Sequence, residues 1–198
     1  VDEVPAPTPE DDEVLVRVSA TTVSRTDCGI LLGKPFPIRF FTGVRRPRSR
    51  VPGTDFAGEV VQTGPAVTDF AIGDRVWGFD DSGLASQAQF LAIGQDAAVA
   101  GIPDGVDAAQ ATASAEGAHY ALNFMKRARY VSGQRVCVYG ATGAIGSAAV
   151  QLLVAEGSEV TAFCRAENAE LVRGLGADTV VDYTTQDLAT YPDRFDLV

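Results

Sequence analysis

The chain contains 198 residues, and 46% of them are hydrophobic, which is enough to bury the core of one large domain or two small ones. A formal net charge of −10 argues against nucleic acid or an anionic membrane as a partner. The three cysteines are widely spaced and include no C-x-x-C pair, so we expect no disulfide framework and a cytoplasmic location. The acidic, proline-rich start VDEVPAPTPEDDE has none of the apolar core of a signal peptide.

The first half of the chain predicts short strands separated by glycine turns. Apolar and polar residues alternate in EVLVRVS, as they do in a half-buried strand. The predicted strands lie at residues 13–19, 52–64, 75–79 and 86–93. After the first of them, SRTDCGILLG predicts a short helix that is capped by Ser24 or Thr26 and ends at Gly33. Many short strands with glycine turns indicate an all-β, barrel-like domain.

Four arginines fall within residues 45–50, after a stretch that is typical of a loop. The ordinary explanation for such a cluster is a solvated loop. The alternative is a cationic rim that attracts an anionic substrate or a cofactor phosphate. Both interpretations are kept at this stage.

The pattern changes near residues 103–112. An alanine-rich stretch from Asp107 predicts a helix, and strand and helix patterns then alternate as far as Val198. We therefore divide the chain into an all-β domain, residues 1–106, and an α/β domain, residues 107–198.

Residues 135–156 carry the clearest motif. A β-branched strand leads into the glycine turn GATGAIG, and a run of small and aliphatic residues then predicts a helix. This context fits a dinucleotide-binding turn, in which Gly143 lets the backbone approach a pyrophosphate and Gly146 lets the helix sit close to its strand. The predicted cofactor-binding residues of this turn are Ala141, Thr142, Gly143, Ala144, Ile145 and Gly146. Ala141 replaces the first glycine of the usual pattern, so a buried strand–helix unit without a ligand is the alternative.

The next predicted strand covers residues 158–163. It ends where a dinucleotide-binding fold places the residue that contacts the adenosine ribose. An NAD site usually has a carboxylate at this position, but this chain has Phe163-Cys164-Arg165. A guanidinium in place of a carboxylate suits the 2′-phosphate of NADP. We therefore predict NADP(H) as the cofactor, with Cys164 and Arg165 at its ribose.

Six stretches in order resemble the medium-chain dehydrogenase/reductase superfamily, in its zinc-free, quinone oxidoreductase-like branch. They are VLVRV, SRTDCGILLG, PGTDFAGEVVQTG, GDRVWGF, RVCVYGATGAIGSAAVQL and LGADTVVDY. The resemblance implies a GroES-like β-barrel domain followed by a Rossmann domain with a doubly wound parallel sheet, in a homodimer. By comparison with the family the chain looks cut at both ends, so only the N-terminal half of the Rossmann sheet is expected.

The zinc-dependent branch of this family has a cysteine where this chain has Ser24, and a histidine where it has Thr54. Two hydroxyls are a poor substitute for a thiolate and an imidazole, so we predict no metal site. The resemblance also implies structural roles for Asp27 and Arg75, and it places Tyr183 beside the NADP 2′-phosphate.

A reductase of this kind transfers hydride to a quinone or an α,β-unsaturated carbonyl without needing a Lewis acid. Some relatives have a tyrosine or lysine where this chain has Gly29. Because glycine has no side chain that could donate a proton, any proton donor must come from elsewhere. The candidates are Glu116, His119 and Tyr120, whose segment runs beside the nicotinamide in the family; a packing or capping role is the alternative. The predicted function is an NADPH-dependent quinone or enone reductase. The other possibility is a non-catalytic nucleotide-binding or scaffold protein.

Overall fold

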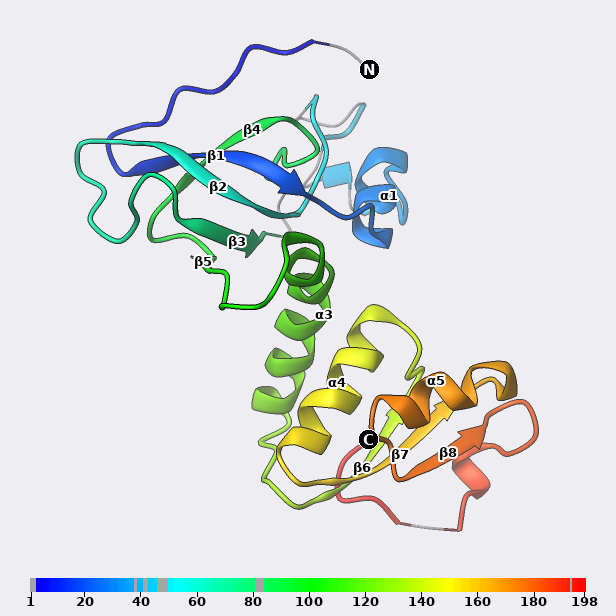
Figure 1. Ribbon diagram of the computed structural model, residues 1–198. Coiled ribbons are helices and arrows are strands. Elements are labelled where there is room, and N and C mark those ends of the chain that lie inside the picture. Colours follow the sequence, from blue (N-terminus) through cyan, green and yellow to red (C-terminus); the bar gives the residue numbers. More distant parts are fainter. Residues whose placement is uncertain (1–2, 38, 41–42, 46–49, 81–83, 193) are drawn as a thin grey trace. The chain divides into compact units, whose positions relative to one another are not determined.

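The computed structural model describes residues 3–37, 39–40, 43–45, 50–80, 84–192 and 194–198 (Figure 1). The chain forms two compact units, Val1–Ala115 and Glu116–Val198, and each is considered by itself. The centre of the arginine cluster, residues 46–49, lies outside the described residues, so neither interpretation of it is tested. Across the described ranges, no helix is both long enough and apolar enough to cross a membrane.

The first unit contains a five-stranded antiparallel sheet in the order β4-β1-β2-β3-β5 (Figure 1). Its strands are β1 (Glu13–Ala20), β2 (Asp55–Thr63), β3 (Arg75–Phe79), β4 (Phe90–Gly94) and β5 (Val99–Gly101). The first three confirm the predicted strands. The fourth starts later than predicted, because the chain near Ser86 forms a loop in which Ser86 Oγ lies 3.2 Å from Thr21 Oγ1. The three-residue β5 was not predicted, since it is too short to show a pattern.

The alternating pattern of β1 places every second residue in the core of this unit. Val14 and Val16 are fully buried, and Val16 is paired with Val60 on one side and Leu91 on the other. This core explains why the register of the sheet is fixed, since a shift by one residue would expose both valines.

Helix α1 (Arg25–Leu32) begins with a capping box. Ser24 Oγ accepts hydrogen bonds from the backbone N–H of Thr26 and Asp27, and Asp27 Oδ2 accepts one from Ser24 N at 2.8 Å. Gly33 ends the helix in the left-handed region, with φ of 58°. The cap is therefore Ser24 and not Thr26, and the predicted stop at Gly33 is confirmed.

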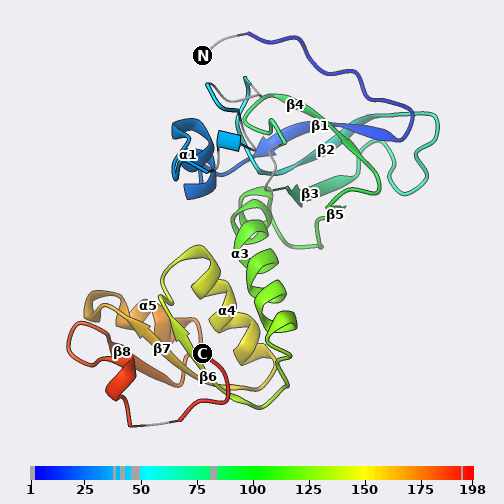
Figure 2. The same ribbon diagram turned by 180° about the vertical axis from the view of Figure 1, so that it is seen from behind.

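The second unit contains a parallel sheet in the order β6-β7-β8, which is half of a doubly wound fold (Figure 2). Its strands are β6 (Arg135–Tyr139), β7 (Glu159–Cys164) and β8 (Thr179–Asp182), and its helices are α4 (Ala144–Ala155), α5 (Ala169–Gly174) and the short η1 (Ala166–Asn168) and η2 (Leu188–Thr190). Helix α3 (Ala108–Arg127) begins in the first unit and ends in the second. Near the end of the chain, Leu197 forms a single parallel bridge with Val136.

The core of the second unit lies between this sheet and its helices. Val136, Val138, Val160 and Ala162 pack in one cluster with Val150 and Leu153 of α4. Because strand residues alternate, Tyr139 and Phe163 point to the other face of the sheet. The predicted order of strand, turn and helix is thus confirmed across residues 135–182.

Candidate functional site

The glycine turn joins β6 to α4 and is tied to the neighbouring strand. Gly140 has a φ of 82°, and the N–H groups of Gly140 and Ala141 both donate to Phe163 O, at 3.0 and 3.2 Å. Gly143 is the N-cap of α4 and provides no side-chain cap. The N–H groups of the first turn of a helix have no partner within it, so those of Ala144 to Gly146 can bind an anion.

The two predicted glycines differ in what surrounds them. A Cβ at Gly146 would lie 2.3 Å from Gly140 O and 2.9 Å from Ala141 Cα, so helix α4 starts in close contact with the turn. This confirms a packing constraint at Gly146. Gly143 has a φ of −74°, and a Cβ there would meet only Gly140 O at 3.6 Å. Neither its conformation nor a neighbouring protein atom excludes a Cβ, so the role predicted for Gly143 rests on its closeness to a pyrophosphate, which stays a prediction.

A third glycine, Gly117 of α3, was not predicted to matter. A Cβ on it would lie 2.5 Å from Ala144 O, at the first residue of α4. Gly117 therefore lets α3 pack against the helix start that follows the glycine turn. A glycine inside an alanine-rich helix costs about 1 kcal/mol, and that cost was the available signal.

The predicted ribose residues Cys164 and Arg165 lie in different environments. Cys164 is 1% exposed and belongs to the core, and burial raises the pKa of its thiol. Arg165 is exposed, and its Nε donates to Tyr183 Oη at 3.1 Å. This hydrogen bond is the main cause of a raised pKa of Arg165. The structure thus brings Arg165 and Tyr183 together, and it turns the Cys164 side chain inward.

Asp182 organises the same corner, although it was not predicted. Its Oδ1 accepts from Thr184 N at 2.9 Å and from Thr184 Oγ1 at 2.7 Å. These bonds, with a weaker contribution from the backbone of Ala166, lower the pKa of Asp182. Its ionised carboxylate therefore caps the turn after β8, at the strand end next to Arg165 and Tyr183.

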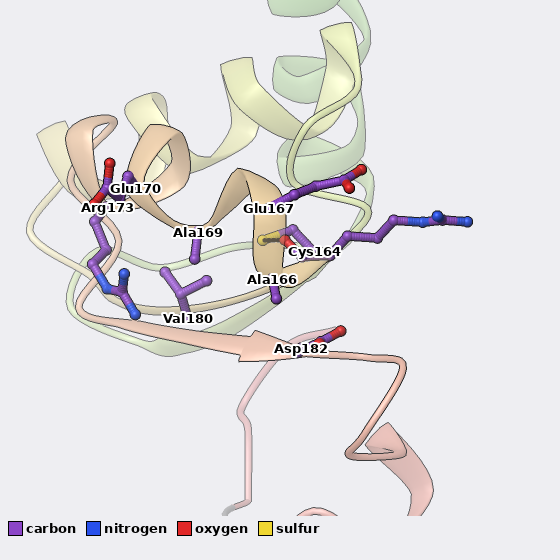
Figure 3. Close-up of a pocket in the computed structure, with 9 residues that line it drawn as sticks. Cys164, Ala166, Glu167, Ala169, Glu170, Arg173, Val180 and Asp182 are labelled. Atoms are coloured by element: carbon purple, nitrogen blue, oxygen red, sulfur yellow. Dashed lines mark hydrogen bonds between the residues drawn. The ribbon is translucent and has the colours of Figure 1, made fainter.

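A pocket of about 490 Å³ lies beside these residues (Figure 3). It is lined by Cys164, Arg165, Ala166, Glu167, Ala169, Glu170, Arg173, Val180 and Asp182. Two guanidinium groups can pair with a phosphate, and the carboxylates can accept from hydroxyl groups. The lining thus combines two guanidinium groups with three carboxylates, so it offers donors and acceptors for hydroxyl groups without a net positive charge.

The three candidate proton donors lie on α3. His119 Nε2 and Asn123 Nδ2 are 2.9 Å apart, and the His119 ring contacts Tyr120 edge-on at 5.5 Å. Asn123 Nδ2 can donate to His119 Nε2 in the ring tautomer that carries its proton on Nδ1. Glu116 is half-buried, three residues before His119. The catalytic role of all three stays a prediction.

Residues 10–123 match the family described as "Alcohol dehydrogenase GroES-like domain", over more than half of the chain. The chain belongs to the medium-chain dehydrogenase/reductase superfamily, in its quinone oxidoreductase-like branch. The antiparallel unit is accordingly GroES-like, and the parallel unit is part of a Rossmann fold.

The curated relatives include a chloroplastic quinone-oxidoreductase homolog of Spinacia oleracea, which is 36% identical over 95% of this chain and 57% of the relative. A second is a chloroplastic NADPH-dependent alkenal/one oxidoreductase of Arabidopsis thaliana, 33% identical over 96% of this chain and 50% of the relative. The chain spans about half the length of the curated relatives that it matches.

Two solved structures show the same fold. The quinone oxidoreductase of Coxiella burnetii has a TM-score of 0.86 at 24% identity, covering 98% of this chain and 62% of that one. The quinone oxidoreductase of Escherichia coli in complex with NADPH has a TM-score of 0.75 at 25% identity, covering 95% and 55%.

In the zinc-dependent branch of the superfamily, zinc ligands occupy the positions of Ser24 and Thr54. In this quinone oxidoreductase-like chain both side chains have other surroundings. Ser24 Oγ is occupied as the cap of α1, and Thr54 is fully buried. Among the residues that the structure describes, no group of three or more histidine, cysteine or acidic side chains could hold a metal ion. The ligands needed for a catalytic zinc are not provided by Ser24 and Thr54.

Asp27 and Arg75, for which the resemblance implied structural roles, both contact the backbone. Asp27 is 1% exposed and completes the capping box of α1. Arg75 Nη2 donates to Val106 O at 2.6 Å, linking β3 to the segment before α3. These contacts account for both residues within the GroES-like unit.

Proposed function

We propose that the protein is an NADPH-dependent, zinc-independent reductase of quinones or α,β-unsaturated carbonyls. The observation that carries the proposal is the Arg165–Tyr183 pair, which lies at the ends of two strands next to the glycine turn. In a dinucleotide-binding fold this corner receives the adenosine ribose. The family and the names of the relatives support the substrate class.

Two parts of the cofactor, the pyrophosphate and the 2′-phosphate, have matching groups on the second unit. The N–H groups at the start of α4 would bind the pyrophosphate, with the helix dipole behind them. Arg165 and Tyr183 would bind the 2′-phosphate through a charge-assisted hydrogen bond and a hydroxyl. NADPH, when bound, supplies the hydride for the reduction.

The substrate class follows from what the GroES-like unit does not provide. In the zinc-dependent branch a Lewis acid stabilises the alkoxide during alcohol oxidation, and Ser24 and Thr54 do not provide the ligands for one. A quinone or enone carbon is already polarised, so orientation and exclusion of water are sufficient. The proton would come from water or from His119 Nδ1 on α3. We also propose a homodimer, in line with the resemblance.

The test is NADPH oxidation by the full-length protein with a panel of quinones, alkenals and saturated aldehydes. We expect turnover with quinones or with alkenals, and no NADP⁺ reduction with simple alcohols. Tight NADPH binding without oxidation by any acceptor would instead favour the non-catalytic nucleotide-binding protein. Alcohol oxidation that responds to zinc would contradict the proposal.

A further inference from the structure

Three aromatic rings meet at the carboxyl end of the parallel sheet. The ring of Tyr139, the last residue of β6, stacks on Tyr183 at 5.6 Å and on Phe163 at 5.8 Å, with interplanar angles of 28° and 25°. Phe163 is fully buried and is the register partner of Tyr139 in the sheet. The buried ring therefore provides a fixed support for the more exposed pair.

Tyr139 connects two parts of the proposed cofactor site. It directly precedes Gly140, where the glycine turn begins, and its ring reaches Tyr183 across the intervening strand β7. Tyr183 in turn accepts the hydrogen bond from Arg165 Nε. A continuous set of contacts thus runs from the strand before the turn to the guanidinium.

We infer that Tyr139 is a positioning residue for cofactor selection, which holds Tyr183 by ring stacking and through it orients Arg165 toward a 2′-phosphate. This inference rests on the proposed NADPH dependence. The stack uses the tyrosine ring and not its hydroxyl, so phenylalanine should replace it. Aromatic pairs prefer such offset, nearly parallel geometry, and an aliphatic side chain cannot reproduce it.

The exposure of Tyr139 makes the inference testable without loss of the fold. In this chain the residue is 58% exposed and does not belong to the core cluster of the second unit, and the thermal melts report any loss of stability in the full-length protein. Tyr191 provides a matched control, because its ring also packs against Phe163, edge-on at 5.4 Å, and contacts Phe195.

The experiment measures the dissociation constants of NADPH and NADH for the full-length protein, four single variants and one double variant, together with their thermal melts. Tyr139→Leu should weaken NADPH by about 3- to 10-fold, equivalent to about 0.7–1.4 kcal/mol, and leave NADH unchanged. Tyr139→Phe should keep the wild-type preference, and Tyr191→Leu should change both cofactors equally or neither. In a Tyr183→Leu background, adding Tyr139→Leu should have no further effect on NADPH.

The outcomes separate this inference from the proposed function. Equal affinities of the wild type for NADPH and NADH would overturn the proposed cofactor preference, and this inference with it. A wild-type preference that persists in Tyr139→Leu would overturn the inference alone. So would a parallel loss of NADPH and NADH binding with a lower melting temperature, which a purely structural role predicts.

Discussion

Under the proposed function, Arg165 is the residue that most directly sets the preference for NADPH. Its guanidinium is exposed at the end of β7, and the Tyr183 hydroxyl holds it in one orientation. A pre-oriented guanidinium loses little rotamer freedom when it binds a phosphate. Arg173 lines the same pocket but comes from the far end of α5, so the two arginines can be told apart by substitution.

Replacement of Arg165 by alanine should weaken NADPH binding by about 1–3 kcal/mol, because a charge-assisted bond to the 2′-phosphate is lost. NADH, which has no such phosphate, should bind as before. Fluorescence titration of both cofactors gives the two changes, and Arg173→Ala is the control with a smaller effect. A larger loss in Arg173→Ala than in Arg165→Ala would place the phosphate elsewhere in the pocket.

The glycine turn offers a second prediction at this scale. Gly146→Ala should lower the free energy of unfolding by about 1–3 kcal/mol, since its Cβ would overlap the backbone of Gly140 and Ala141. Gly143→Val should preserve the fold, because a Cβ there meets only Gly140 O at 3.6 Å, yet it should abolish cofactor binding. Thermal melts and cofactor titration separate the two effects. Normal NADPH binding by Gly143→Val would mean that the pyrophosphate does not lie on this turn.

At the scale of elements, sequence patterns predicted the helices, strands and turns that local backbone preferences determine. The strand–turn–helix of residues 135–156 and the helix ended by Gly33 could be predicted because propensity, capping and periodicity agree there. β5 and the role of Gly117 could not, since both depend on contacts with residues distant in sequence. Arg165 was predicted from its position after a strand, whereas Asp182 was missed because its role comes from hydrogen bonds across two strand ends.

Helix α1 provides the prediction at this scale. Ser24→Ala should destabilise the protein by about 0.5–2 kcal/mol, because the N–H groups of Thr26 and Asp27 lose their acceptor. Ser24→Asp should retain most of the stability, since aspartate is an equally good cap. Chemical denaturation of both variants provides the comparison. Equal losses in the two variants would show that the cap does not stabilise α1.

At the scale of the whole molecule, the two units differ in chemistry, and both are consistent with the proposed reduction. The GroES-like unit has hydroxyl side chains at the positions where zinc ligands occur in other members of the superfamily. The Rossmann unit contains the glycine turn and the Arg165–Tyr183 pair, to which we propose that NADPH binds. Together they favour hydride addition to an already polarised carbon over oxidation of an alcohol.

The most direct test of this claim is the fate of deuterium from NADPH labelled at the nicotinamide C4. The full-length protein is incubated with the labelled cofactor and an α,β-unsaturated aldehyde, and the product is analysed by mass spectrometry and NMR. We expect a saturated aldehyde with deuterium at the β carbon and an intact carbonyl group. An allylic alcohol with deuterium at the carbonyl carbon, or no transfer to any enone or quinone, would contradict this expectation.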